Sequence, residues 1–202
     1  MQLPEHPGGA SRLAGANRER IDRAGAGKPG KYTYASSGFG ASPHLSAEWF
    51  KLMTTTDILH VPYTGSGPAL PALLGGHVDM MFDTMPSVWP LVQEGKLRAL
   101  GVTTATRVPF VPELPAIAET LPGFDVTSWL GIMVPAGSPP EIRLKISAEL
   151  DGFLRDPATV QRFKELGAVT AHSTPEAFAA YVRQDYDKWQ RVIRDTGIKL
   201  AD

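Results

Sequence analysis

Two glycine-rich turns, each placed between a strand-like run and a helical run, constrain the fold of this chain more than any other feature. The first turn lies within YASSGFGAS at residues 34–42, and the second is YTGSGP at residues 63–68. Alternating residues lead into the first turn, and an apolar run at 57–63 leads into the second. Strands that alternate with helices at this spacing predict an α/β fold with a parallel or mixed sheet covered by helices.

Helical patterns follow both turns. Ser42 and Pro43 have the pattern of an N-cap and a first-turn proline, and apolar residues then recur at helical spacing. The helix after the second turn is expected to end at Gly75. Further along, we expect strands at 77–83 and 97–103, with a helix at 86–95 that is interrupted by Pro90.

The last third of the chain predicts one strand and three amphipathic helices. The strand is expected at 126–135, after a proline-rich connection. The first helix opens with a capping-box pattern from Ser138 to Glu141, and Asp156 and Thr174 have the position of caps for the other two. Three helices have a single strand to cover, which indicates a sheet that lacks strands.

Composition excludes several classes of partner. The chain has 202 residues, and its 20 Lys and Arg nearly balance 21 Asp and Glu, so no strong field attracts nucleic acid or an anionic membrane. No apolar run is long enough to cross a bilayer, and the first 20 residues lack the apolar core of a secretion signal. There are no cysteines, and no His, Asp and Glu have the spacing of metal ligands. We therefore expect neither a metal nor a cofactor.

A glycine loop that runs into a helix can bind an anion, because the first helical amides have no intrahelical partners and carry the positive end of the macrodipole. Ser36 and Ser37 add hydroxyls, and Gly38 and Gly40 allow the backbone to close on a carboxylate or phosphate. The second turn, over residues 64–67, offers a similar anion-binding nest, that is, a group of backbone amides that can point at one anion. Two nests at one edge of a sheet predict a ligand with an anionic end.

Several of these features also have a purely structural interpretation. Tight glycine turns are common, and GFGAS lacks the spacing of a nucleotide-binding fingerprint. We interpret His44 as a hydrogen-bonding residue at the helix start and His60 as a core histidine. Asp79 and Asp83 share one face of a strand, but we expect Asp79 to cap its edge and Asp83 to border a cleft. We interpret the four tryptophans as core residues, with Trp129 as the candidate exception that could be a ligand platform.

Four longer stretches agree in order and spacing with one protein family. They are KPGKYTYASSGFGASPHLSAEWFK at 28–51, HVPYTGSGPALPALLGGHVDMMFD at 60–83, GKLRALGVTTATR at 95–107 and SWLGIMVPAGSPPEI at 128–142. Together they resemble the Bug-type periplasmic substrate-binding receptors of tripartite tricarboxylate transporters. The resemblance implies a type II periplasmic-binding-protein-like α/β fold, whose two lobes close on a small carboxylate and deliver it to membrane permease subunits. The ligand would be a di- or tricarboxylate, an amino acid or an aromatic acid.

The resemblance implies a ligand site in the second lobe and no catalytic residue. Ala41 stands where the family usually has serine, and Ser42 is the candidate substitute. The implied site residues are Ser36, Ser37, Gly38, Gly40, Ala41, Ser42 and His44 after the first strand, Tyr63, Thr64, Gly65 and Ser66 after the second, and Asp83 and Thr84 after the third.

The resemblance also implies a domain organisation. Residues 1–29 would be an irregular, partly helical lead-in, 30–125 the second lobe, and 126–202 the returning part of the first lobe, with one strand and three helices. Family members have several strand–helix units before the PGK motif at 29–31, so we expect an incomplete first lobe. A periplasmic location is implied by the family alone. Exposed sheet edges would favour a homodimer.

Two other classes of function stay open. The chain could be a truncated, non-transport remnant that acts as an interaction or dimerisation module. A serine hydrolase would use Ser36 or Ser37 as nucleophile and His44 as base, but a GxSxG elbow and an orienting acid are absent from the sequence. We therefore expect a receptor rather than an enzyme.

Overall fold

The computed structural model describes residues 32–198, so the lead-in expected at 1–29 lies outside the described residues. The chain divides into two compact units. Among the described residues, the first unit holds 32–128 and Ile198, and the second holds 129–197.

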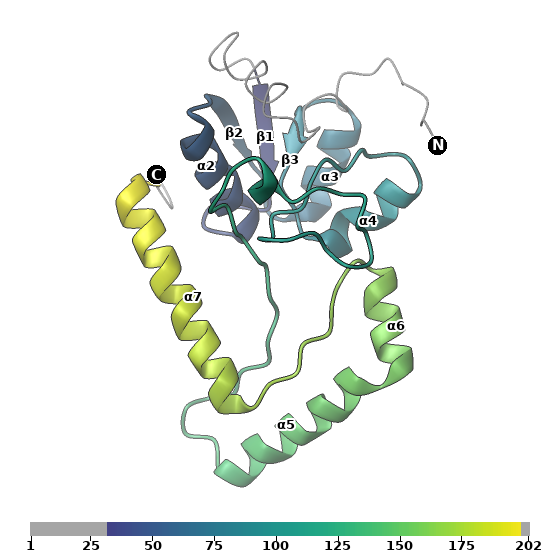
Figure 1. The fold of residues 1–202 in the computed structure, drawn as a ribbon, viewed down its shortest axis with the longest axis vertical. Coiled ribbons are helices and arrows are strands. Elements are labelled where there is room, and N and C mark those ends of the chain that lie inside the picture. The colour runs from purple at the N-terminus through teal and green to yellow at the C-terminus, as the bar shows by residue number, and fades with distance from the viewer. Residues whose placement is uncertain (1–31, 199–202) are drawn as a thin grey trace. The chain divides into compact units, whose positions relative to one another are not determined.

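The first unit is built on a three-stranded parallel sheet in the order β2-β1-β3 (Figure 1). Tyr34 of β1 pairs with His60 of β2 on one side and with Met80 of β3 on the other. β1 is therefore the central strand, and the carboxyl ends of all three parallel strands meet at one edge of the sheet. The strands are β1 (Tyr32–Ser36), β2 (Ile58–Pro62) and β3 (Met80–Met81).

Two helices cover opposite faces of this sheet. The helices of the first unit are α2 (Ser42–Thr54), α3 (Ser66–Leu74) and α4 (Met85–Gln93). Tyr34 hydrogen-bonds to Glu48 of α2, whereas the next residue, Ala35, packs in a cluster with Ala69 and Leu73 of α3. Because successive strand residues point to opposite faces, α2 and α3 lie on different sides of the sheet.

The expected strands are longer than the observed ones. The strand expected at 77–83 is only Met80–Met81, and the one expected at 97–103 is an isolated bridge from Val102 to Ala116. A strand needs a backbone partner along its length, and a local pattern does not specify that partner.

Two details of the helices also differ from expectation. α2 begins at Ser42 itself, with Ala41 as an N-cap that makes no side-chain bond. α4 continues through Pro90 to Gln93, because the proline lies within two turns of the helix start and interrupts little of the hydrogen-bond ladder.

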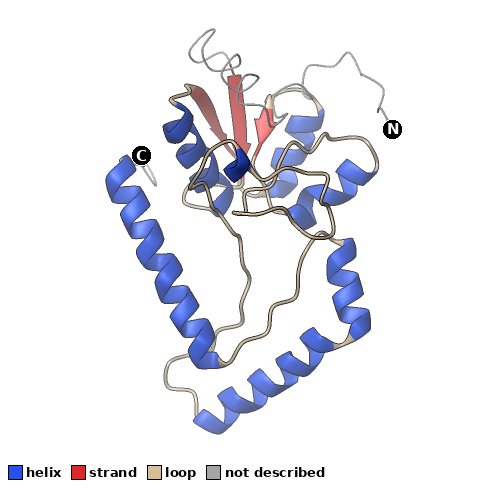
Figure 2. Cartoon of the chain, in the orientation of Figure 1, coloured by secondary structure: helices blue, strands red, loops and turns tan. Residues whose placement is uncertain are grey.

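The second unit contains three helices, which Figure 2 shows in blue. They are α5 (Pro140–Arg155), α6 (Pro157–Glu165) and α7 (Pro175–Thr196). Asp156 accepts a 2.8 Å hydrogen bond from the amide of Thr159, and Thr174 accepts one of 3.2 Å from Ala177. Both predicted caps are therefore confirmed. The predicted capping box of α5 is wrong, because the helix starts after the N-cap Pro139 and has no side-chain cap.

The segment expected as a strand at 126–135 is not a strand in the described structure. Trp129 is held within the second unit, where its indole N–H donates to Asp185 over 2.9 Å and its ring packs against Phe178 and Tyr181. These contacts give Trp129 a packing role, as we interpret the other tryptophans, and not that of the candidate exception. No helix within residues 32–198 is both long and apolar enough to cross a membrane.

Candidate ligand-binding site

The loop between β1 and α2 holds most of the predicted site residues. Gly38 and Gly40 have φ angles of 125° and 74°, a region that side-chain-bearing residues rarely adopt. A Cβ atom on Gly38 would lie 3.4 Å from the carbonyl oxygen of Tyr63, which belongs to the second predicted loop. The two loops therefore approach each other through backbone, and it is the φ angle at position 38 that favours glycine there.

Two hydroxyls of the first loop are open to a ligand. Ser37 and Ser42 are half-buried, and neither side chain hydrogen-bonds to another residue within 32–198. Ser42 is the first residue of α2, where the amides have no intrahelical acceptor, and Ala41 offers no side chain to cap them. Hydroxyl donors beside a helix start form a group that suits a carboxylate.

The two glycine amides of the loop are already bonded. Gly38 N–H donates to Oγ of Ser36, and Gly40 N–H donates to Nδ1 of His44, both over 3.2 Å. The acceptors are buried, since Ser36 and His44 are 0% and 2% exposed. Ser36 and His44 therefore support the loop from inside the unit.

The second loop follows β2 and is tied to the first. The amide of Tyr63 donates to the carbonyl oxygen of Ser36 over 3.1 Å. Gly65 has a φ of 131° and precedes α3. Thr64 is exposed and makes no hydrogen bond to another described residue, so its hydroxyl is also open.

Asp83 completes the site beyond the end of β3. Its Oδ1 accepts hydrogen bonds from the Ser66 hydroxyl at 2.9 Å and from the Thr84 amide at 2.8 Å, while its buried Oδ2 has no partner among residues 32–198. Burial raises the pKa of Asp83, and the two hydrogen bonds offset this only in part. Because the Ser66 hydroxyl proton is directed at Asp83, the donor that Ser66 can offer to an anion is its amide.

Asp79 has a structural role, as expected. Its Oδ2 accepts from both the amide and the hydroxyl of Thr33, at 2.9 Å each. Thr33 lies near the amino end of β1, whereas Asp83 follows the carboxyl end of β3. The two aspartates therefore do not form a carboxylate pair.

A histidine that we had interpreted only as a core residue contacts the site from behind. Nε2 of His60 lies 2.7 Å from Oγ of Ser36, and its ring stacks on those of Tyr34 and His44. The signal that places it there is the register of β1 and β2, which pairs His60 with Tyr34. That register depends on two strands together and is not readable from either alone.

The charges behind the loop are balanced. Burial lowers the pKa of both His44 and His60, to about 4 for His60. Burial alone would raise the pKa of Glu48, but hydrogen bonds from Lys51 and Tyr34 outweigh it and lower that pKa. The two histidines are thus neutral at pH 7, and Glu48 is paired with Lys51 at 2.7 Å. No net negative charge from this group repels a bound anion.

The hydrolase interpretation has no geometric support. Ser36 is fully buried and contacts His60 rather than the proposed base His44. Nδ1 of His44 is occupied by the Gly40 amide, and no carboxylate hydrogen-bonds to either imidazole among residues 32–198. Within the same residues, no cluster of three or more His, Asp and Glu could hold a metal ion.

Residues 18–198 match the family model described as tripartite tricarboxylate transporter family receptor. The chain belongs to this family. It is 40% identical over 167 residues to the UPF0065 protein in the tcbD-tcbE intergenic region of Pseudomonas sp. (strain P51), covering 82% of this chain and 50% of the relative. It is 34% identical over 174 residues to protein BugT of Bordetella pertussis, covering 86% and 53%. The chain thus spans about half the length of these two relatives.

Solved receptor structures share the fold. The structure of R. palustris Rpa4515 with adipate has a TM-score of 0.85 and 34% identity, covering 89% of this chain and 60% of that one. MatC from Rhodopseudomonas palustris with bound malate has a TM-score of 0.80 and 29% identity, covering 89% and 64%. The periplasmic binding protein BugD has a TM-score of 0.80 and 32% identity, covering 90% and 60%. The expected Bug-type resemblance and periplasmic-binding-protein-like α/β fold are confirmed, over part of the length of these receptors.

Proposed function

We propose that this protein is a periplasmic receptor that captures a small carboxylate for the membrane permease subunits of a tripartite tricarboxylate-type transporter. One observation carries the proposal: two loops at the carboxyl edge of one sheet are joined by the Tyr63–Ser36 backbone bond, with the Ser37 and Ser42 hydroxyls open beside the start of α2. Family membership supports a receptor, and the adipate and malate in two structural neighbours support the carboxylate class.

The predicted site residues divide into two roles in this proposal. The hydroxyls of Ser37, Ser42 and Thr64, with the first amides of α2 and α3, donate to the carboxylate oxygens. The remaining residues hold these donors in place by their backbone conformation or hydrogen bonds. They are Ser36, Gly38, Gly40, Ala41, His44, Tyr63, Gly65, Ser66, Asp83 and Thr84.

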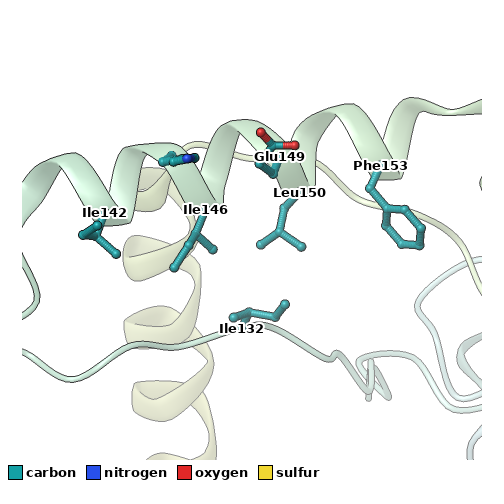
Figure 3. Close-up of a pocket in the computed structure, with 7 residues that line it drawn as sticks. Ile132, Ile142, Ile146, Glu149, Leu150 and Phe153 are labelled. Atoms are coloured by element: carbon teal, nitrogen blue, oxygen red, sulfur yellow. The ribbon is translucent and has the colours of Figure 1, made fainter.

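We assign residues 30–125 to one lobe of a two-lobed receptor and 126–202 to part of the other. The support is an apolar surface in the second unit. Figure 3 shows Ile132 facing α5 across an open groove, whose lining is mainly aliphatic and aromatic. In a two-lobed receptor such a face packs against a sheet, and the greater length of the relatives would include its strands. The groove is lined by Ile132, Ile142, Lys145, Ile146, Glu149, Leu150 and Phe153.

The same surface favours a second candidate function, that of a dimerisation module. Residues 129–135 have no strand partner among the described residues, and the side chains of Leu130 and Met133 are 101% and 65% exposed. A segment without a strand partner that carries exposed apolar side chains can pair with another chain. A homodimer formed through residues 129–135 is the alternative to transport.

Calorimetric titration at neutral pH tests the receptor proposal. The ligands are adipate, malate, citrate and an aromatic carboxylate, and the proteins are wild type, Ser37→Ala, Ser42→Ala and the control Ser173→Ala. Ser173 is exposed and has no hydrogen-bond partner among the described residues. We expect saturable binding of at least one ligand, weakened roughly 10- to 100-fold by Ser37→Ala or Ser42→Ala and unchanged in the control. Absence of binding by folded wild type, or equal affinity in all four proteins, would contradict the proposal.

A further inference from the structure

A stack of aromatic rings lies behind the first loop. The ring of His60 stacks on Tyr34 at 4.7 Å with an interplanar angle of 10°, and on His44 at 4.6 Å with an angle of 28°. Phe39, at the loop itself, meets both histidine rings edge-on, at 4.9 Å from His60 and 5.3 Å from His44. β1, β2, α2 and the loop therefore each contribute one ring to this stack.

Hydrogen bonds connect the stack to the loop backbone at two points. Nε2 of His60 lies 2.7 Å from Oγ of Ser36, which in turn accepts the amide of Gly38. Nδ1 of His44 accepts the amide of Gly40 directly. Both glycine amides are thus directed into the unit, and the open serine hydroxyls at 37 and 42 flank them in the chain.

We propose that His60, acting through Ser36, and His44, as a neutral imidazole, are positioning residues that hold the glycine loop in its ligand-binding conformation. The inference rests on the proposed function, because it assigns the network to carboxylate affinity. Neither ring has to touch the ligand in this arrangement.

The geometry requires the neutral form of His44. A ring nitrogen that accepts an N–H bond carries no proton, so protonation of His44 would place a second donor against the Gly40 amide. Two rings 4.6 Å apart also resist a shared positive charge. The other titratable groups that face the pair are Tyr34, Glu48 and Lys51. The Tyr34 hydroxyl and the Lys51 ammonium both donate hydrogen bonds to Oε1 of Glu48.

Burial acts in the same direction as this geometry, since it lowers the pKa of both histidines. The hydrogen bond from the Gly40 amide to His44 is therefore intact at neutral pH and is lost on acidification. If the two histidines had only a structural role, their substitution would change the free energy of unfolding. It would leave the amide resonances of the loop and the ligand affinity of the folded protein unchanged.

Four variants and the wild type test the inference by NMR. His60→Leu removes the partner of Ser36, whereas His60→Gln keeps a polar group that can reach the position of Nε2. His44→Asn keeps an acceptor near the position of Nδ1 but cannot be protonated. His77→Gln is the control, because His77 is exposed and lies after α3, outside the network. The readouts are the amide resonances of Gly38 and Gly40 against pH, and calorimetric titration with adipate.

We expect the Gly38 and Gly40 amides of the wild type to shift with pH together with the ring signals of His44 and His60. His44→Asn should abolish the pH response of Gly40, and His60→Leu but not His60→Gln should shift Gly38 at neutral pH. Adipate affinity should fall about tenfold in His60→Leu and stay within about threefold of wild type in His60→Gln. If His60→Leu does not fold, the shared pH response in wild type and its loss in His44→Asn still test the network.

Glycine amides that do not respond to histidine protonation or to His60→Leu would overturn the inference, whatever the ligand does. Loop amides that respond as expected, with His60→Leu binding adipate as tightly as wild type, would also overturn it. If the amides respond but wild type binds no carboxylate, the positioning of the loop is supported and the proposed function is the part that fails.

Discussion

The hydroxyl of Ser66 donates a 2.9 Å hydrogen bond to Oδ1 of Asp83, which joins the start of α3 to the residue group that follows β3. A second bond, from the Tyr63 amide to the Ser36 carbonyl, joins the ends of β2 and β1. Three strand ends are thereby connected at one edge of the sheet. A ligand that contacts one loop is therefore sensitive to changes in the other two.

Asp83→Asn should stabilise the protein at neutral pH. The substitution keeps an oxygen that can accept from Ser66 and Thr84 but removes a charge that burial disfavours. Because the pKa of Asp83 is raised in the folded state, its protonated form contributes stability at low pH that is lost as pH rises above the ordinary value of 3.8. Urea unfolding across a pH series should show this loss in wild type and not in the variant. A less stable variant at neutral pH would mean that the ionised carboxylate has a stabilising partner.

The histidine pair should give the opposite pH dependence. The folded-state pKa of His60 is lowered to about 4 from 6.5, so the unfolded chain binds this proton more tightly. The resulting stability is present above pH 6.5 and is lost as pH falls toward about 4. In His60→Gln, the free energy of unfolding should decline less over this interval than in wild type, as measured by the same urea series. An equal decline in both proteins would assign the acid sensitivity to other groups.

Gly38→Ala should lower the free energy of unfolding by about 1–3 kcal/mol, because its φ of 125° is strained for any side chain. The new Cβ would lie 3.4 Å from the Tyr63 carbonyl oxygen, an ordinary contact, so the expected loss comes from the backbone conformation. Gly67→Ala is the matched control, since no atom lies within 4 Å of a Cβ at that position and its φ is not positive. Denaturant unfolding of the two variants compares them directly. Equal stability of both would show that the loop is free to rearrange around position 38.

Leu130→Lys should reduce self-association of the purified protein without lowering its unfolding temperature. The Leu130 side chain is fully exposed, so its replacement removes apolar surface and no packing. Leu52→Lys is the control, as Leu52 is 49% exposed on α2 in the other unit. Analytical ultracentrifugation over a concentration series would measure the association. A wild type that stays monomeric at all concentrations would contradict the dimerisation alternative.

The sequence predicts the elements that depend on local signals. The glycine turns and the caps Asp156 and Thr174 require only neighbouring residues, and the structure contains them. The strand expected at 126–135 does not form within the described residues, because alternation in one segment says nothing of a partner.

In the candidate site too, features set by neighbouring residues could be predicted, and contacts between distant residues could not. The open hydroxyl of Ser37 agrees with the anion-binding loop predicted from the sequence, whereas the Ser36 hydroxyl is buried and contacts His60. The contacts of Ser36 with His60 and of Ser66 with Asp83 span 24 and 17 residues, and they depend on strand register and helix packing. Such long-range pairs explain why the sequence indicates only a core role for His60 and does not predict the contact between Ser66 and Asp83.

The most direct measurement of the central claim is NMR mapping of adipate binding on the wild-type protein. The receptor account predicts saturable shifts in the amides of Ser37, Phe39, Ser42 and Thr64, with smaller changes on the helices of residues 140–196. Shifts confined to amides far from both loops, or the absence of any shift with adipate, malate, citrate and an aromatic carboxylate in turn, would contradict a carboxylate site at this edge of the sheet.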